Sequence, residues 1–360
     1  MPKDSVYQLH GLIEQNIRRS YTGGAVDVYI PHNKTDNKQL FSYDVNSLYP
    51  YTMNEFNMPV GKPITFDGDI RKVEPDAFGF FNCEITSPDY LEHPIIQSRI
   101  KTNFGIRTIA GLGTWFGWIF SKEMDNAIKY GYQFKILKGY QFNESNIFKN
   151  YINALYNLRL QYPKGNPMNL IAKLLMNSLY GKFGMKDEIT SFKILNNTTP
   201  VDKANISDIL DLYNNNIIDI IELDNYTLIL IKDIADMSYN EKDDIWSGTE
   251  VNISIASAIT SYSRIHMSQF KNNPDFKLYY SDTDSITINK PLHDSMIGSA
   301  LGLMKLENVI NKAVFLAPKV YALITNDGKE IVKVKGLSHD VISKLTFNDL
   351  EVLLIKDSSR

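Results

Sequence analysis

The stretch FSYDVNSLYP, residues 41–50, places a carboxylate, Asp44, at the end of a short apolar run that Pro50 stops. A charge at the end of a buried strand destabilises a fold unless a partner compensates it. Divalent cations such as Mg²⁺ are partners that bind carboxylate oxygens. The chain must therefore fold so that this strand ends where its charge is neutralised.

A second acidic pair lies in YYSDTDSITI, residues 279–288, where Asp282 and Asp284 flank a threonine. The pattern predicts a strand, a turn and a strand, and in an extended segment both carboxylates would point the same way. Neighbouring carboxylates raise each other's pKa unless a cation lies between them. An Asp-rich hairpin turn without a ligand is the alternative interpretation.

The segment NLIAKLLMNSLYGKFG, residues 169–184, predicts a helix with two chemically different faces. At about 100° per residue, Lys173, Asn177 and Tyr180 lie on one face, and a plain solvent-exposed face is their alternative interpretation. The opposite face, expected in the core, carries Ile171, Ala172, Leu175 and Leu179. Carboxylates on strand ends beside a basic helix are the parts required for metal-assisted phosphoryl or nucleotidyl transfer.

Composition sets limits on this hypothesis. The 360 residues allow one lobed unit or two domains, and no apolar run approaches the ~18 residues of a membrane span. The single Cys83 excludes an internal disulfide framework and a thiolate zinc site. The net charge of −3 by itself argues against a nucleic-acid partner. However, residues 202–244 contain eleven acids and three lysines, a local net charge of −8, which leaves +5 for the remainder.

The periodicity and the turn residues predict an alternation of helices and strands. Expected helices cover residues 7–19, 121–131, 250–270 and 295–312, with two more within 143–184 separated at YPKGNP. Expected strands cover residues 25–31, 40–45, 190–195 and 226–232, followed by a hairpin over 319–336 with NDGK at its turn.

Three segments together resemble a known family. DVNSLYP (44–50), KLLMNSLYGKFG (173–184) and YSDTDS (280–285) are similar to motifs A, B and C of family B DNA polymerases, in the protein-primed branch of bacteriophages and linear mitochondrial plasmids. YTGG (21–24), TSYSR (260–264) and KVY (319–321) resemble smaller motifs of that branch. The resemblance implies an α+β right-hand polymerase fold, with an antiparallel-sheet palm, helical fingers and a short or truncated thumb.

The resemblance also implies a division of the chain. The expected parts are an N-terminal segment (1–40), a first palm part (41–80), an insertion (81–142), fingers (143–186), an acidic insertion (187–245), a second palm part (246–325) and the start of a thumb (326–360). Family members carry a proofreading exonuclease before the polymerase part, and the residues before YTGG are too few for one. We therefore expect a fragment, a shortened gene or a decayed copy.

Residue roles follow from the matching motif positions. Asp44 and Asp284, with the backbone carbonyl of Val45, would hold two Mg²⁺ ions or Mn²⁺, and Asp282 would support them. The nucleotide-binding positions would be Ser47, Leu48, Tyr49, Lys173, Asn177 and Tyr180, with Tyr49 as the gate under the sugar. The DNA-binding positions would be Tyr21, Gly23, Gly24, Ser178, Gly181, Arg264, Lys319 and Tyr321. Either Arg159 or Lys164 would supply a second phosphate-binding cation.

The favoured hypothesis is a DNA-directed DNA polymerase with primer-template DNA and dNTPs as partners, a terminal protein as a further candidate primer, and no membrane. A non-catalytic remnant is the rival hypothesis, whereas SDTDS and NSLYG disfavour an RNA polymerase or a reverse transcriptase. The resemblance favours a mitochondrial location, with phage-infected bacterial cytoplasm as the alternative. The acidic segment is expected to lie away from the DNA phosphates or to contact a protein.

Overall fold

The computed structural model describes residues 6–34, 38–103, 105–185, 188–213, 216–234, 238–240, 245–247 and 251–354. The chain forms two compact units, the first of Met1–Gly181 with Ile253–Arg360 and the second of Lys182–Asn252. Within the described residues, no helix has both the length and the hydrophobicity needed to cross a membrane.

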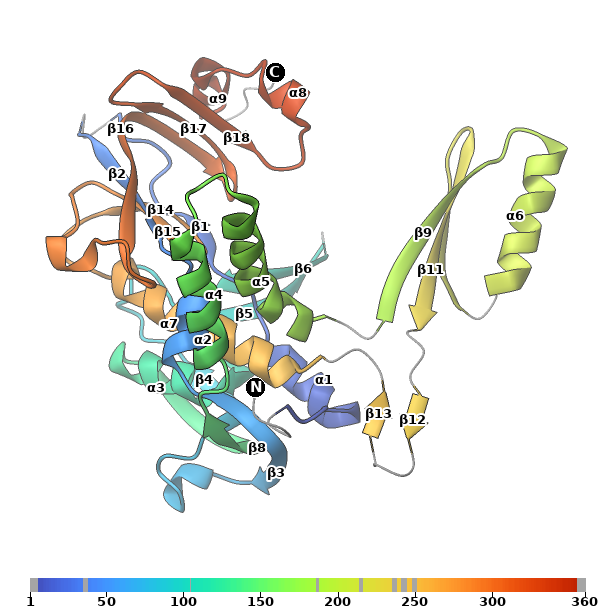
Figure 1. Ribbon diagram of the computed structural model, residues 1–360, viewed down its shortest axis with the longest axis horizontal. Coiled ribbons are helices and arrows are strands. Elements are labelled where there is room, and N and C mark those ends of the chain that lie inside the picture. The colour runs from blue at the N-terminus through green and yellow to red at the C-terminus, as the bar shows by residue number, and fades with distance from the viewer. Residues whose placement is uncertain are drawn as a thin grey trace. The chain divides into compact units, whose positions relative to one another are not determined.

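The first unit is built on a seven-stranded antiparallel sheet in the order β1-β14-β15-β2-β16-β17-β18 (Figure 1). Tyr43, Ile286 and Met304 from three neighbouring strands bury their side chains in one core. The sheet lies where the sequence predicts the palm. Its strands are β1 (Val26–Val28), β2 (Leu40–Val45), β14 (Leu278–Asp282), β15 (Ser285–Ile288), β16 (Met304–Ala317), β17 (Val320–Thr325) and β18 (Glu330–Val334).

Strand β16 corrects one sequence prediction, because residues 295–312 were expected to form a helix. Only a short 3₁₀ turn, Asp294–Met296, is helical there, and β16 pairs with both β2 and β17. The pairing register shifts between Leu306 and Asn308 and again between Ile310 and Lys312. Each such irregularity breaks the alternation of side chains along a strand. The apolar spacing of β16 therefore imitates the period of a helix.

A second sheet, in the order β3-β8-β4-β7, forms the insertion that follows β2. Phe80, Phe81 and Phe120 are fully buried there. Helix α3 (Ser121–Lys129) begins directly after β7, at the serine where the sequence predicts a helix start. The strands are β3 (Met58–Asp67), β4 (Gly79–Thr86), β7 (Thr114–Phe120) and β8 (Gln133–Ser145), with the 3₁₀ turn Ile70–Lys72 and a separate hairpin of β5 (Gln97–Thr102) and β6 (Gly105–Ala110).

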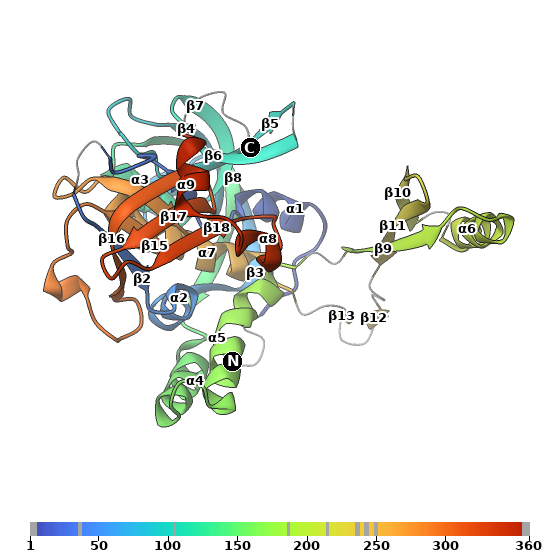
Figure 2. The same ribbon diagram turned by 90° about the horizontal axis from the view of Figure 1, so that it is seen from above.

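Helix α7 (Ile253–Lys271) is the central helix of the first unit. It is buried along nearly its whole length and packs against helices α1, α2 and α3 and against both sheets. The antiparallel pair α4 and α5, where the fingers are expected, projects from one side of this unit (Figure 2). The remaining helices are α1 (Gly11–Ser20), α2 (Leu48–Glu55), α4 (Lys149–Gln161), α5 (Pro167–Phe183), α8 (His339–Ile342) and α9 (Phe347–Val352).

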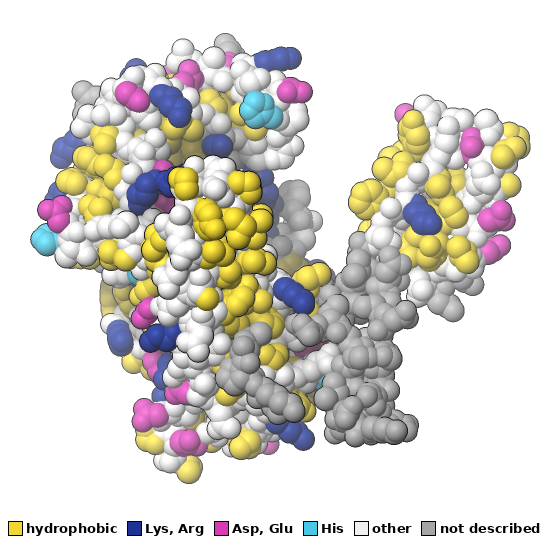
Figure 3. Space-filling view, viewed as in Figure 1, with side chains coloured by type: hydrophobic (Ala, Val, Ile, Leu, Met, Phe, Trp, Pro, Cys, Tyr) yellow, Lys and Arg dark blue, Asp and Glu magenta, His cyan; other side chains and the backbone are white. Residues whose placement is uncertain are grey.

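Helix α5 corrects a second prediction, about which side of it is buried. Ile171 and Leu175 were expected in the core, but each is 45% exposed. Ala172 is buried as expected and Leu179 is half-buried, whereas Met176, which was not assigned to the core, is fully buried. The apolar side chains of α5 form part of the hydrophobic surface that covers the front of the α4–α5 pair in Figure 3. The helix is apolar on more sides than the core needs, so periodicity alone could not identify its buried face.

The second unit contains a three-stranded antiparallel sheet in the order β10-β11-β9, together with α6. Ile229 and Ile231 on the central strand have fully buried side chains. Part of the acidic segment, residues 214–215, 235–237 and 241–244, lies outside the described residues. The elements are β9 (Glu188–Asn196), α6 (Pro200–Tyr213), β10 (Ile217–Glu222), β11 (Tyr226–Ile234), β12 (Ser238–Asn240) and β13 (Ile245–Ser247). Antiparallel sheets with separate helices in both units confirm the α+β class.

The hydroxyl of Tyr43 tests how the main sheet is fastened to the loop after β15. It accepts a hydrogen bond of 3.1 Å from the buried backbone N–H of Leu292. Tyr43→Phe leaves that N–H without an acceptor, so we expect the free energy of unfolding to fall by about 1–2 kcal/mol in urea titrations. Tyr90→Phe is the matched control, because Tyr90 is 76% exposed and also makes one hydrogen bond. Equal losses in the two variants would contradict this account.

Candidate active site

The register of the main sheet brings the two predicted metal ligands together. Asp44, next to last in β2, lies opposite Ser285 of β15 on one side and Lys305 of β16 on the other. The backbone N–H of Val45 donates to the carbonyl of Asp284 over 2.7 Å. Asp44 in β2 and Asp284, in the turn directly before β15, are therefore neighbours, although 240 positions separate them in the sequence.

Both carboxylates lie in surroundings that disfavour their charge. Burial, then the charges of Asp284 and Glu307, raise the pKa of Asp44 to about 7, while Lys305 and Lys173 act in the opposite direction. Burial is also the largest cause that raises the pKa of Asp284, and the charge of Asp282 adds to it. A pair of desolvated carboxylates is stabilised in its ionised form by a cation between them.

The turn that joins β14 to β15 separates the roles of its two aspartates. Thr283 adopts a left-handed conformation with φ of 56°, and the N–H of Asp284 donates to the carbonyl of Asp282 over 2.6 Å. The carboxylate of Asp282 accepts two hydrogen bonds, 2.7 and 2.6 Å long, from Nζ of Lys319. The segment forms a strand, a turn and a strand, as the sequence predicts, and the left-handed turn at Thr283 gives the two carboxylates different surroundings.

The donors present fit a hard divalent cation. No cluster of three or more His, Cys, Asp or Glu side chains suited to a metal occurs in the part of the chain that is described. Two carboxylates are nevertheless enough for Mg²⁺, which keeps waters and substrate phosphates as its other ligands. The elevated pKa of Asp44 supports this fit, since burial and neighbouring acids leave the site short of positive charge.

Helices α2 and α5 meet at two tyrosines. Tyr49, in the first turn of α2, stacks on Tyr180 of α5 with ring centroids 4.0 Å apart and an angle of 29°. Burial, then the neighbouring Tyr180, raise the pKa of Tyr49. The charge of Asp284 also acts on the Tyr49 hydroxyl, so this ring lies near the carboxylate pair. Leu48 beside it is buried in the core, so its contribution to a nucleotide site is through the backbone or packing.

Polar groups surround this tyrosine pair. Ser47 precedes α2 in a left-handed conformation with φ of 54°, and its hydroxyl accepts a hydrogen bond of 3.3 Å from Arg159 of α4. On α5, the side-chain amide of Asn177 donates to the carbonyl of Lys173 over 2.9 Å. Lys173 is exposed and contributes to the field at Asp44. The predicted nucleotide positions therefore gather around the carboxylate pair.

Six of the eight predicted DNA positions fall into three groups. Gly23, Gly24 and Lys319, together with Lys335, line a groove of about 300 Å³. Tyr321 packs its ring against Tyr280 and Phe315 behind that groove. Ser178 and Gly181 lie on the exposed side of α5, apart from the groove residues.

Arg264 occupies a different environment from the one that its predicted contact with DNA requires. Its guanidinium is buried against Glu123 of α3 and the backbone carbonyls of Thr22 and Gly23. A hydrogen bond from Arg99 holds the carbonyl of Tyr21, the first residue of the same YTGG turn. The burial of Arg264 argues against direct contact with DNA and places it behind the turn.

A family model provides the first comparison with known proteins. The model described as DNA polymerase type B, organellar and viral, matches residues 2–276 of the chain. The chain belongs to this family. The matched region includes DVNSLYP and KLLMNSLYGKFG. YSDTDS, residues 280–285, lies just beyond its end.

Individual relatives agree with this membership. A probable DNA polymerase of Ascobolus immersus is 39% identical over 99% of this chain and 28% of its own length. A probable DNA polymerase of Neurospora intermedia is 36% identical over 99% of the chain and 36% of its own length. The chain thus spans about a third of the length of these relatives.

A solved structure shares the fold. Phi29 DNA polymerase complexed with primer-template DNA superimposes with a TM-score of 0.70 at 20% identity, over 97% of this chain and 59% of that one. At this level of identity the likeness concerns the fold alone. It confirms the expected right-hand polymerase fold.

The sequence analysis did not identify two charged residues at this candidate site. Lys305 lies opposite Asp44 in the sheet, and its ammonium pairs with Glu307. Both belong to β16, which the periodicity assigned to a helix. The sequence carries no motif for them, and only a correct strand assignment for residues 304–317 would have placed them beside Asp44.

The raised pKa of Asp44 predicts how stability depends on pH when no divalent cation is present. A carboxyl whose pKa is higher in the folded state stabilises the fold at low pH and loses that contribution as pH rises. The relevant window runs from its ordinary 3.8 to about 7. In a chelator, Asp44→Asn should therefore raise the melting temperature by about 2–4 °C at pH 8 and leave it unchanged near pH 4.

Differential scanning calorimetry measures this difference. Asp275→Asn, on an exposed turn, is the matched control and should follow the parent at every pH. Added Mg²⁺ or Mn²⁺ should stabilise the parent at pH 8 and have less effect on Asp44→Asn. A parent whose melting temperature is insensitive to the cation would contradict the proposed ligand pair.

Proposed function

We propose that the chain adds deoxynucleotides to the 3′ end of a primer, as the polymerase part of a DNA-directed DNA polymerase. The single observation that carries this proposal is the pairing of two desolvated carboxylates, Asp44 and Asp284, across neighbouring strands in a member of the type B polymerase family. A fold that only needed stability would not keep this pair.

The metal requirement follows from the donor set. Asp44, Asp284 and the backbone carbonyl of Val45 would hold two Mg²⁺ ions, with Mn²⁺ as a substitute. When bound, the cations would supply Lewis-acid stabilisation of the charge that develops during phosphoryl transfer. Asp282, which is paired with Lys319, would act in support of this pair.

The residues around the carboxylates would position the incoming nucleotide. Lys173 would attract its phosphates as a point charge, a role that suits an exposed lysine whose charge is felt at Asp44. Asn177 and Tyr180 would border the new base pair. Arg159 is the better candidate for the second phosphate-binding cation, because it donates a hydrogen bond to Ser47 within motif A. Lys164 lies exposed in the turn between α4 and α5.

The primer and the template would run along the groove of Gly23, Gly24, Lys319 and Lys335, where Lys335 would offer its charge to phosphates and Lys319 is paired with Asp282. Glycines allow the DNA backbone to approach closely. The resemblance extends the proposal to priming by the hydroxyl of a terminal protein. Relatives from fungi and from a phage also suit replication of a mitochondrial plasmid or a phage genome.

Primer extension by the purified protein tests the proposal, with a primed template, Mg²⁺ and the four dNTPs. Asp44→Asn and Asp284→Asn should each lower the rate by at least about 100-fold while the protein stays folded. Asp282→Asn should cost less, because Lys319 already compensates that carboxylate. A parent protein that binds primed DNA but does not extend it would support the rival hypothesis of a non-catalytic remnant.

Tyr49 provides a second test, through the choice of sugar. Its ring is held in place by Tyr180, so a 2′-hydroxyl on the incoming nucleotide would meet a rigid wall. Tyr49→Val should leave dNTP addition largely intact and increase ribonucleotide incorporation by about 100-fold or more. Tyr49→Phe keeps the ring and should reject ribonucleotides like the parent. Loss of dNTP addition in Tyr49→Val together with unchanged rejection would show that the ring is needed for packing only.

A further inference from the structure

The buried guanidinium of Arg264 uses every donor that it has. Its Nε and Nη2 donate to the two carboxylate oxygens of Glu123 over 2.6 and 2.7 Å, and Nη2 also donates to Ser261 over 2.9 Å. Nη1 donates to the carbonyls of Thr22 and Gly23 over 2.7 and 3.2 Å. The side chains of the pair are only 6% and 9% exposed. An arginine whose five donors are all engaged is a rigid brace.

The YTGG turn packs directly against the acidic turn of the candidate active site. A side-chain atom added to Gly24 would come within 2.5 Å of the Thr283 side chain, so the backbone of Gly24 lies directly against that side chain. The next carbonyl, that of Ala25, accepts a hydrogen bond of 2.9 Å from the N–H of Thr283. Strand β1 then pairs with β14, with Val26 opposite Asp282.

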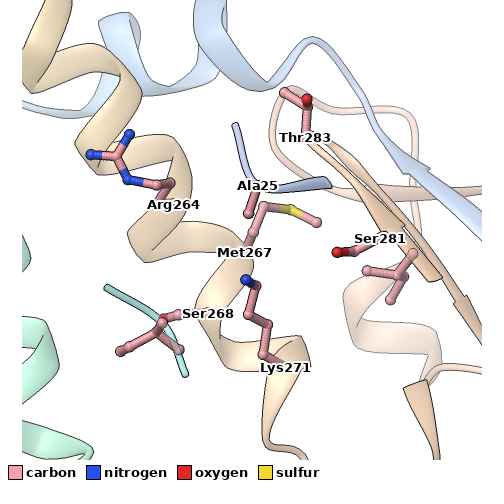
Figure 4. A pocket seen from close by; sticks show the side chains of 9 residues that line it. Ala25, Arg264, Met267, Ser268, Lys271, Ser281 and Thr283 are labelled. Atoms are coloured by element: carbon pink, nitrogen blue, oxygen red, sulfur yellow. The ribbon is translucent and has the colours of Figure 1, made fainter. Parts of the chain in front are cut away.

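Figure 4 shows the same relation from inside the unit, with Ala25 between Arg264 on α7 and Thr283 on the turn. The cavity behind them measures only about 20 Å³. That volume has room for a single water at most. The acidic turn therefore rests on packed groups on this side of Arg264, whereas the Glu123–Arg264 pair borders a larger cavity of about 470 Å³ on another side.

We propose that the Glu123–Arg264 ion pair is a positioning device that holds the YTGG turn and, through it, the left-handed Thr283 between Asp282 and Asp284. Glu123 belongs to the insertion, so this part of the chain contributes to the geometry of the metal ligands without touching the substrate. Arg99, from the β5–β6 hairpin of the same insertion, reinforces the brace at Tyr21. The inference rests on the proposed polymerase function.

Glu123→Gln and Arg264→Lys test this role. Glutamine keeps the shape of Glu123 but removes the charge, and lysine cannot make the paired contacts of a guanidinium. Hydrogen–deuterium exchange should become faster by about 10-fold in the peptide that contains residues 278–288. Direct Mn²⁺ binding, followed by electron paramagnetic resonance of the free ion, should weaken by about 5-fold.

In primer extension, both variants should lower kcat by about 10-fold, while KM for dNTP and Kd for primed DNA stay within about 2-fold of the parent. Asp125→Asn is the matched control. Asp125 lies on the same helix as Glu123, and this change breaks its ion pair with Arg71. Among the hydrogen bonds and ion pairs described, Asp125 makes none with the YTGG turn. This control should leave exchange, Mn²⁺ binding and kcat unchanged.

The inference is overturned if Glu123→Gln behaves like Asp125→Asn in exchange and Mn²⁺ binding. It is also overturned if Arg264→Lys raises Kd for DNA and keeps kcat, because Arg264 would then contact DNA directly. Glu123→Gln decides the matter if Arg264→Lys does not fold. Exchange and Mn²⁺ binding need no turnover, so they decide the inference even where the parent extends no primer and the proposed function itself fails.

Discussion

The main sheet holds two carboxylates close enough to repel each other, and the rest of the first unit is arranged around this constraint. Pairing of β2 with β15 brings Asp44 and Asp284 together, and burial makes the charge of each more costly. Hydrogen bonds of the sheet and the buried cores on both sides of it hold this arrangement. In the proposed function, the first unit would be the scaffold that keeps the two carboxylates close for a cation and a substrate phosphate.

Much of this arrangement could be predicted from the sequence. Strand β2 begins and ends where the motif predicted, and the hairpin of β17 and β18 turns at NDGK. These elements carry their own signals, since alternation and turn residues act over a few positions. Strand β16 and the buried side of α5 could not be predicted, because bulges in one and surplus apolar residues in the other remove the periodic signal.

The sequence predicts those site residues that belong to a short motif. It does not predict the contacts that site residues make with distant segments. The roles of Asp44 and Asp284 stay predictions, although the structure places the two residues together. The partners of Asp282 and Arg264, namely Lys319 and Glu123, lie 37 and 141 positions away. Such pairs are fixed by tertiary packing, so no local pattern could have shown that one arginine is buried and one aspartate already compensated.

Three residues other than glycine have positive φ angles within the described chain, namely Ser47, Thr283 and Lys319. All three adjoin the carboxylate site, and each left-handed residue costs about 1–2 kcal/mol. Stability and chemistry therefore compete for the same backbone positions. A lineage selected only for thermal robustness would relax these turns first, so a decayed copy of such a gene could outlast its activity as a well-folded protein.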